Sequence, residues 1–268
     1  MYKVKILSKG KIIASVALVF SFCCSANIDA QISGISGGKL IVPDAFTIEK
    51  SHFEFEPAFS VFDAKQHFNT NGDLNNLTKD EVSSDVSFRI SLGLADNLEL
   101  GTEFSTGIED VMIGSKFTAF NHGNTAIALI VGGSFPAGNF TGFDSTQIRT
   151  SKYSYSAGVV ISNKMENGLS IDAVVSYTKI NGQSDYNKFL TYGLSVGYLY
   201  TDAFQAIIEL NGFTTYNNNF YSKKISFTPG FTYEFSDHLH LVFAVQNDAW
   251  GKNELSGTNY VTAFTMCF

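Results

Sequence analysis

Apolar and polar residues alternate along most of the chain after residue 50, in runs of about ten residues separated by clusters of Asn, Asp, Gly and Ser. Such alternation predicts β-strands, because successive side chains of a strand point to opposite faces of the sheet. Twelve runs of this kind can be identified, at residues 51–63, 81–94, 98–106, 110–120, 125–136, 150–162, 168–180, 188–200, 204–215, 223–235, 238–248 and 258–268.

The connections between these runs alternate in length. Short turns fall at residues 95–97, 121–124, 163–167, 201–203 and 236–237, and longer loops fall at 64–80, 137–149, 181–187, 216–222 and 247–257. The connection 107–109 is tight although it lies on the long-loop side. Short turns at one end and long loops at the other are typical of outer-membrane β-barrels, in which the short turns are periplasmic.

Charged residues fall almost entirely on one of the two faces of the predicted strands. The opposite face is apolar, as in the series Phe53, Phe55, Phe59 and Val61. If the apolar face meets lipid, the charged face lines the interior of a closed barrel. The candidates for this lumen lining are Glu54, Glu56, Arg89, Glu99, Glu103, Asp110, Lys116, Asp172, Glu209, Lys224, Glu234 and His240.

A soluble β-sandwich or barrel also alternates, but its apolar face would be the interior. The apolar face of this chain is rich in Phe and Tyr, which suits a lipid-facing band with aromatic girdles. Glycine recurs on the charged face, at Gly93, Gly101, Gly114, Gly158, Gly193, Gly197 and Gly230. Glycine weakens a strand that merely faces water, so its repetition favours a tightly curved wall around a narrow lumen. We therefore predict that residues 51–268 form an all-β, up-and-down antiparallel transmembrane β-barrel of about 12 strands.

The first thirty residues have the layout of a secretory signal peptide, with a basic stretch, an apolar run from Ile12 to Cys24 and a polar step to Ala30. The apolar run is too short for a spanning helix. We expect residues 1–30 to be removed by cleavage after Ala30. Lipidation at Cys23 or Cys24 is the alternative, but the small residue that a lipobox places before its cysteine is missing.

Removal of the signal peptide changes the composition of the mature chain. Cleavage removes four lysines and Asp29, so the net charge falls from -7 to -10. A chain this acidic is a poor nucleic-acid binder. Cys267 is then the only remaining cysteine, which excludes a disulfide framework and a thiolate metal cluster.

Residues 31–50 lack strand alternation and contain Gly34, Gly37, Gly38 and Pro43. We expect this N-terminal segment either to extend into the periplasm or to fold into the lumen as a plug. Within the barrel, Pro57 and Pro229 fall inside predicted strands. Because proline cannot donate a ladder hydrogen bond, we expect local bulges at both.

The last strand ends the chain on an alternating series of Tyr260, Thr262, Phe264, Met266 and Phe268. This series resembles the C-terminal signature of outer-membrane proteins that the barrel assembly machinery recognises. Tyr260, Phe264, Met266 and Phe268 are therefore the candidate assembly signal, and the assembly machinery and outer-membrane lipid are the expected partners.

The stretch 96–139 carries two short motifs. Gly107, Asp110, Gly114 and Lys116 form a "GxxDxxxGxK" pattern, and a "PxG" follows the next strand at Pro136 to Gly138. Both resemble motifs of the outer-membrane family labelled "putative MetA-pathway of phenol degradation". The resemblance implies an outer-membrane barrel that transports small molecules, including hydrophobic or aromatic ones, and it implies no catalytic residues.

The residues of the mature chain offer little support for enzymatic chemistry. None of the histidines is followed by the His-x-Ser arrangement of an outer-membrane phospholipase. His238 and His240 share a strand face, but no third metal ligand is suggested nearby. Glycines alternate along strands and form no phosphate-binding loop. We expect no enzyme activity, no metal and no cofactor.

The expected function is a channel or transporter for small molecules in the outer membrane. Acids outnumber bases among the lumen candidates, so we expect a preference for cations, set mainly by Glu54, Glu56, Glu99, Glu103 and Glu209. In a closed lumen, these charges would instead pair across strands. A structural or adhesion barrel acting through its outer loops, and a lipid-modifying enzyme, remain as alternatives.

Overall fold

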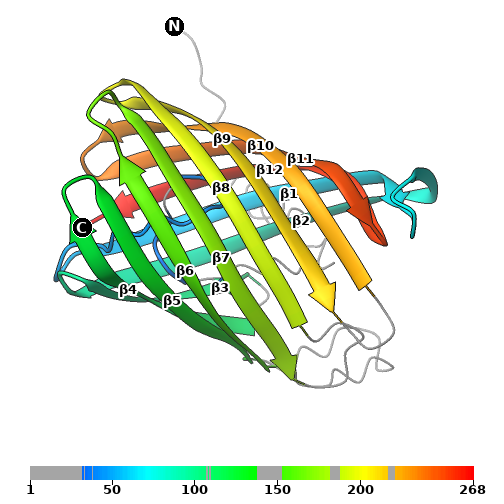
Figure 1. The fold of residues 1–268 in the computed structure, drawn as a ribbon, viewed down its shortest axis with the longest axis horizontal. Helices are drawn as coiled ribbons and strands as arrows, with labels where there is room; N and C mark the ends of the chain where they lie inside the picture. Colours follow the sequence, from blue (N-terminus) through cyan, green and yellow to red (C-terminus); the bar gives the residue numbers. More distant parts are fainter. Residues whose placement is uncertain are drawn as a thin grey trace, which may run out of the picture.

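The computed structural model describes residues 32, 34–37, 39–106, 108, 110–137, 153–181, 188–216 and 221–268. Twelve β-strands form a closed barrel (Figure 1). The strands are β1 (Phe53–Phe68), β2 (Leu74–Ala95), β3 (Leu98–Ser105), β4 (Asp110–His122), β5 (Thr125–Pro136), β6 (Tyr153–Lys164), β7 (Leu169–Asn181), β8 (Lys188–Thr201), β9 (Phe204–Tyr216), β10 (Tyr221–Ser236), β11 (Leu239–Lys252) and β12 (Glu254–Cys267).

Each strand pairs in antiparallel fashion with its neighbours in sequence, and β1 pairs with β12 to close the barrel. This is the predicted up-and-down transmembrane topology. The described part of the chain contains no helix long and apolar enough to cross a membrane.

The two chain ends of the barrel meet at the seam between β1 and β12. The backbone N–H of Phe53 donates to the carbonyl of Phe268 at 3.0 Å, and the N–H of Phe268 donates to the carbonyl of Phe53 at 3.0 Å. The two rings stack with centroids 4.7 Å apart. The seam therefore ends on the side of the short turns, the side that outer-membrane barrels turn toward the periplasm.

Two connections expected to be long loops are strand over most of their length. β1 and β2 extend outward to a turn at residues 69–73, and β11 and β12 meet at Asn253. In the first turn the Asn69 side chain accepts the N–H groups of Asn71 and Asp73 at 2.8 and 2.9 Å. The β1–β2 hairpin extends beyond the neighbouring strands (Figure 1). Alternation fails to predict these extensions because both faces meet water beyond the membrane, so neither needs to be apolar. Residues 138–149, 182–187 and 217–220 of the other long loops lie outside the described residues.

The bulges expected at the two prolines are not present. Pro57 lies opposite Phe88 of β2 and Pro229 opposite Ile208 of β9, and the register continues past both without a shift. On the other side of each proline the ladder is interrupted and then resumes in register. The missing N–H removes ladder bonds on one side, but no residue is inserted. Bulges occur instead at sites such as 64–66 in β1 and 118–120 in β4.

The apolar face of the strands points outward. Phe59, Val175 and Tyr260 are 47%, 55% and 49% exposed, although they lie within strands. Such exposure of large apolar side chains is typical of a lipid-facing surface. The interior therefore receives the charged face, and residues that precede β1 also lie there.

Candidate functional site in the barrel interior

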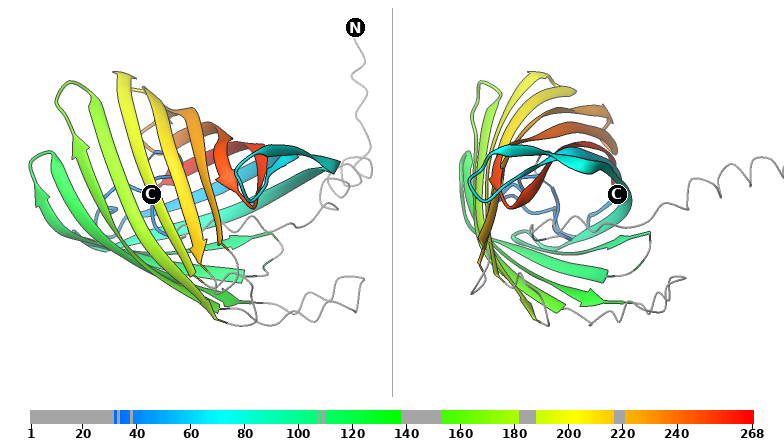
Figure 2. Two further views of the ribbon diagram at one scale, coloured as in Figure 1. Left: turned by 45° about the vertical axis from the view of Figure 1, so that its right-hand side comes forward. Right: turned by 90° about the vertical axis from the view of Figure 1, so that its right-hand side faces the viewer.

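The described residues between 32 and 49 lie inside the barrel, and we call them the interior segment. Figure 2 shows this segment, in blue, within the ring of strands. Ile32, Ile35, Val42 and Ala45 are all at most 4% exposed. Residues 1–31, with the expected cleavage site after Ala30, lie outside the described residues.

Glu209 of β9 holds the middle of the interior segment. Its carboxylate accepts the backbone N–H groups of Leu40, Ile41 and Val42 at 3.3, 2.9 and 3.1 Å, and the residue is 0% exposed. Three successive N–H groups converge on one carboxylate, so its buried charge is compensated by hydrogen bonds instead of by water.

Glu99 of β3 and Lys116 of β4 form a second attachment point. The carboxylate of Glu99 accepts the N–H of Ser36 at 2.6 Å, the hydroxyl of Ser36 at 2.8 Å and the N–H of Ile48 at 3.0 Å. The Nζ of Lys116 lies 3.6 Å from Glu99 and donates to the carbonyl of Phe46 at 2.7 Å. These contacts attach both the start of the interior segment, at Ser36, and its end, at residues 46–48, to the barrel wall. Both charged side chains are 0% exposed.

Further polar contacts follow the segment around the lumen. Lys39 pairs with Asp172 of β7, and both side chains are buried. Ala45 donates its N–H to Ser162 of β6 at 2.8 Å and accepts the Thr118 hydroxyl of β4 at 2.7 Å. These contacts come from strands on different sides of the barrel, so the segment crosses the lumen.

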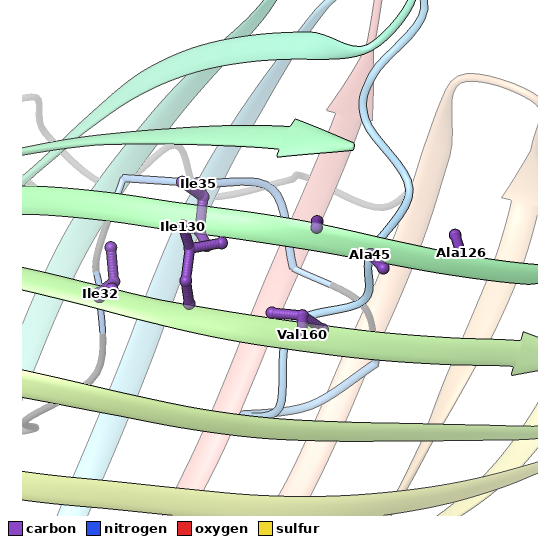
Figure 3. Close-up of a cluster of buried hydrophobic side chains, with 7 residues drawn as sticks. Ile32, Ile35, Ala45, Ala126, Ile130 and Val160 are labelled. Atoms are coloured by element: carbon purple, nitrogen blue, oxygen red, sulfur yellow. The ribbon is translucent and has the colours of Figure 1, made fainter. Parts of the chain in front are cut away.

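An apolar cluster completes the attachment. Figure 3 shows Ile32, Ile35 and Ala45 of the interior segment against Ala126, Ile130 and Val160 of β5 and β6. These wall positions point inward, where the charged face was expected, and they are small or aliphatic. They give the segment a dry patch to pack on, which adds hydrophobic stabilisation to the polar contacts.

Most of the inward glycines are explained by the same segment. A Cβ on Gly101 would collide with the carbonyl of Gly34, and one on Gly93 would lie 2.6 Å from the carbonyl of Ile48. Added Cβ atoms on Gly193, Gly197 and Gly230 would lie within 2.7 Å of Val42, Lys39 and Leu40. The interpretation of these glycines as features of a curved wall was therefore incomplete, because they make room for the interior segment. Gly158 differs, since its nearest neighbours belong to β7.

A second charged group lies on the wall formed by β1, β2 and β3. The Arg89 Nη2 is 2.9 Å from Glu56 and 3.9 Å from Glu54, and Arg89 lies directly opposite Glu103. The Thr265 hydroxyl also donates to Glu56. Three carboxyl groups therefore surround one guanidinium on this wall.

Between the interior segment and the long-loop end of the strands, the barrel contains a cavity of about 850 Å³. Ile32, Ile41, Val42 and Pro43 of the interior segment lie at its base. The Phe and Tyr side chains on its wall are Phe62, Phe68, Phe189, Tyr192 and Phe213. The lumen is thus a cavity whose base is the segment, lined by both aromatic and polar groups.

The polar part of the cavity wall centres on Lys224 and Asp248. The two side chains are 3.2 Å apart, and Asp248 also accepts the hydroxyl of Ser226 at 2.6 Å. The ammonium of Lys224 lies 5.7 Å from the ring centre of Phe62 and 5.8 Å from that of Phe213. This side of the cavity offers charge next to aromatic surface, which suits a ligand with both characters.

The remaining lumen candidates lie near the two rims. Asp110 is exposed at the first position of β4. Glu234 and His240 face each other at 3.9 Å near the periplasmic end. Of the motif glycines, Gly114 lies against Gly34 inside the barrel, while Gly107 and Gly138 lie outside the described residues.

The position of Glu99, Lys116, Asp172 and Glu209 corrects the expectation that they line open space. All four point inward, but the interior segment covers them and uses their charges. The aromatic residues of the cavity are not among the expected lumen residues. Phe62 and Phe213 share the strand parity of Glu54 and Glu209, so the alternation itself could have identified them.

Comparisons with known proteins agree with this architecture. An outer-membrane channel from Pseudomonas putida F1 superposes with a TM-score of 0.71 at 12% identity, covering 84% of this chain and 98% of that one. The NanC porin gives 0.53 at 11% identity, with 79% and 98% covered. A KdgM porin in complex with disordered oligogalacturonate gives 0.51 at 9% identity, with 81% and 99% covered. At such identities the likeness establishes the fold alone.

No curated protein matches this sequence. The family model described as "Putative MetA-pathway of phenol degradation" matches residues 53–264, which is nearly the whole barrel. The chain therefore belongs to this family, and its fold is that of an outer-membrane β-barrel.

Proposed function

We propose that the protein is an outer-membrane channel that admits small, partly apolar molecules into the outer half of its barrel. The observation that supports this most directly is the cavity of about 850 Å³ with aromatic and charged groups on its wall. A pocket of this size and lining fits a small organic molecule. The family description and the channels of similar fold support the same function.

In this proposal the interior segment acts as a plug. It closes the periplasmic half of the lumen, so a molecule in the cavity crosses only when the segment moves or leaves a narrow path beside it. The buried attachments at Glu99, Asp172 and Glu209 make the closed state the resting state. The expected preference for cations would then apply only to the open state, in which these carboxylates face the lumen.

The proposal is tested by cysteine labelling on intact cells. In a Cys267→Ser background, Asn211→Cys places a thiol on the cavity wall, and Ser162→Cys places one beneath the interior segment. An impermeant thiol reagent added outside should label position 211 and leave position 162 unlabelled. Small aromatic solutes should slow the labelling at 211.

Absence of labelling at position 211 would contradict an outward-opening cavity. Labelling that no apolar or aromatic solute slows would contradict ligand entry and favour a structural or adhesion barrel. Equal labelling at both positions would show that the segment does not close the lumen.

A further inference from the structure

Four lysines lie at the outer ends of neighbouring strands, on the lipid-facing side of the barrel. Lys179 is near the end of β7, Lys188 begins β8, Lys223 is near the start of β10 and Lys252 ends β11. Lys179 continues the outward series of Val175 and Tyr177, which are 55% and 43% exposed. We call these four residues the rim lysines.

The rim lysines form two like-charged pairs. Lys179 lies directly opposite Lys188, and Lys223 lies directly opposite Lys252. Like charges at directly opposed positions destabilise a sheet unless something neutralises them. Inside the barrel, Lys39, Lys116 and Lys224 all have carboxylate partners, whereas no acid among the described residues pairs with a rim lysine. An anionic group bound from outside would supply the counter-charge that the described residues do not provide.

Aromatic side chains surround the rim lysines at the same level. The Lys223 ammonium lies 4.0 Å from the ring centre of Trp250, and that of Lys179 lies 5.9 Å from Tyr155. Tyr216, opposite Lys188, is 47% exposed. Tyr and Trp belts mark the membrane interface of outer-membrane barrels. The rim lysines therefore lie where the lipid headgroups of the outer leaflet lie.

We propose that the rim lysines bind the phosphate groups of a bisphosphorylated disaccharide lipid of the outer leaflet. Opposed lysines have Cβ atoms about 5 Å apart, so one pair can share one phosphate. The two pairs are separated by three strand spacings, about 14 Å, and by two residues along the strand, about 7 Å, so they lie about 16 Å apart. A disaccharide with a phosphate at each end spans a comparable distance, so one lipid molecule can reach both pairs. This inference does not depend on whether the lumen conducts.

The test uses the purified mature chain and native mass spectrometry with lipid A as the probe. The wild type should bind bisphosphorylated lipid A more tightly than the monophosphorylated form, and dephosphorylated lipid least. One lysine near an anionic lipid surface contributes about fivefold in affinity, so Lys179→Gln with Lys188→Gln should weaken binding by about 25-fold. Lys179→Arg with Lys188→Arg should retain it.

The matched control is Lys50→Gln with Lys65→Gln. It removes the same charge from exposed positions, one beside the periplasmic start of β1 and one 3.5 Å from Asp63. Heat-modifiable gel mobility confirms that each variant is folded. An equal loss of affinity in the control would show that the effect depends only on the net charge of the protein, and this would overturn the proposed site.

Three other results would overturn the proposal. Unchanged binding of lipid A after all four rim lysines are replaced by Gln would show that these lysines do not bind the lipid. Displacement of lipid A by millimolar inorganic phosphate would indicate a site for free phosphate. Equal affinity for phosphatidylglycerol would contradict recognition of two phosphates on one disaccharide.

Discussion

Replacement of Glu209 by Gln should release the interior segment without unfolding the barrel. The Glu209 carboxylate is the shared acceptor for three backbone N–H groups, at distances of 2.9 to 3.3 Å. Gln keeps one carbonyl acceptor, but its amide N–H₂ would face one of the same donors. A hydrogen bond to a charged acceptor is worth about 1.5–3 kcal/mol. Ile41 and Val42 both donate to Oε2, so a Gln carbonyl in that place keeps these two bonds as neutral ones, about 1 kcal/mol weaker each, while the Leu40 N–H loses its acceptor. Together these changes cost about 3 kcal/mol, because the cost of burying the carboxylate is relieved at the same time.

This magnitude predicts a change in the undocked population of about 100-fold, since about 1.4 kcal/mol corresponds to a factor of ten. The assay is thiol labelling at Ala45→Cys in a Cys267→Ser background. Ala45 is 0% exposed and does not line the cavity, so a reagent reaches it only when the segment undocks. The labelling rate should be up to about 100-fold higher in Glu209→Gln than in the parent protein.

The matched control for this experiment is Glu234→Gln. Glu234 is also a glutamate of a neighbouring strand, but it faces His240 near the rim. The labelling rate should not change in this variant. Equal rates in Glu209→Gln and the wild type would refute the reasoning, because the carboxylate would then contribute nothing to docking.

Three further predictions test the glycines, the seam and the processing of the chain. Gly101→Val should displace the segment and raise single-channel conductance while the barrel still folds, because its side chain would occupy the position of the Gly34 carbonyl; unchanged conductance would count against the close approach. Deletion of Phe268 should reduce the folded, heat-modifiable form more than it alters the activity of the molecules that assemble, because Phe268 closes the seam against Phe53; normal levels of folded barrel would disprove this. Mass spectrometry of outer-membrane fractions should find a mature chain that starts near Gln31; an intact N-terminus would contradict cleavage.

The alternation predicts the barrel well for a physical reason. Within the membrane one face of each strand must be apolar, so the pattern marks the residues that span it. The signal weakens at residues 64–80 and 247–257, where both faces meet water, so the pattern predicts loops there although the structure has mostly strand. Strand identity in those regions depends on pairing with a neighbour, which the local pattern does not record.

The inward direction of Glu99 and Glu209 could be predicted from strand parity, but their partners could not. Those partners are backbone groups of a segment that lies 63 residues away from Glu99 and up to 169 from Glu209. The segment has no periodicity of its own that indicates where it binds. The repeated glycines were the available clue, since they mark places where another backbone approaches the wall closely.

The most direct test of the account compares the wild type with a mature chain that lacks residues 31–49, by single-channel recording in planar bilayers under a salt gradient. We predict a small conductance for the wild type. For the shortened chain we predict a large and stable conductance with cation preference, because Glu99, Asp172 and Glu209 would then face an open lumen. A folded shortened barrel with the conductance and reversal potential of the wild type would contradict the claim that this segment closes the channel.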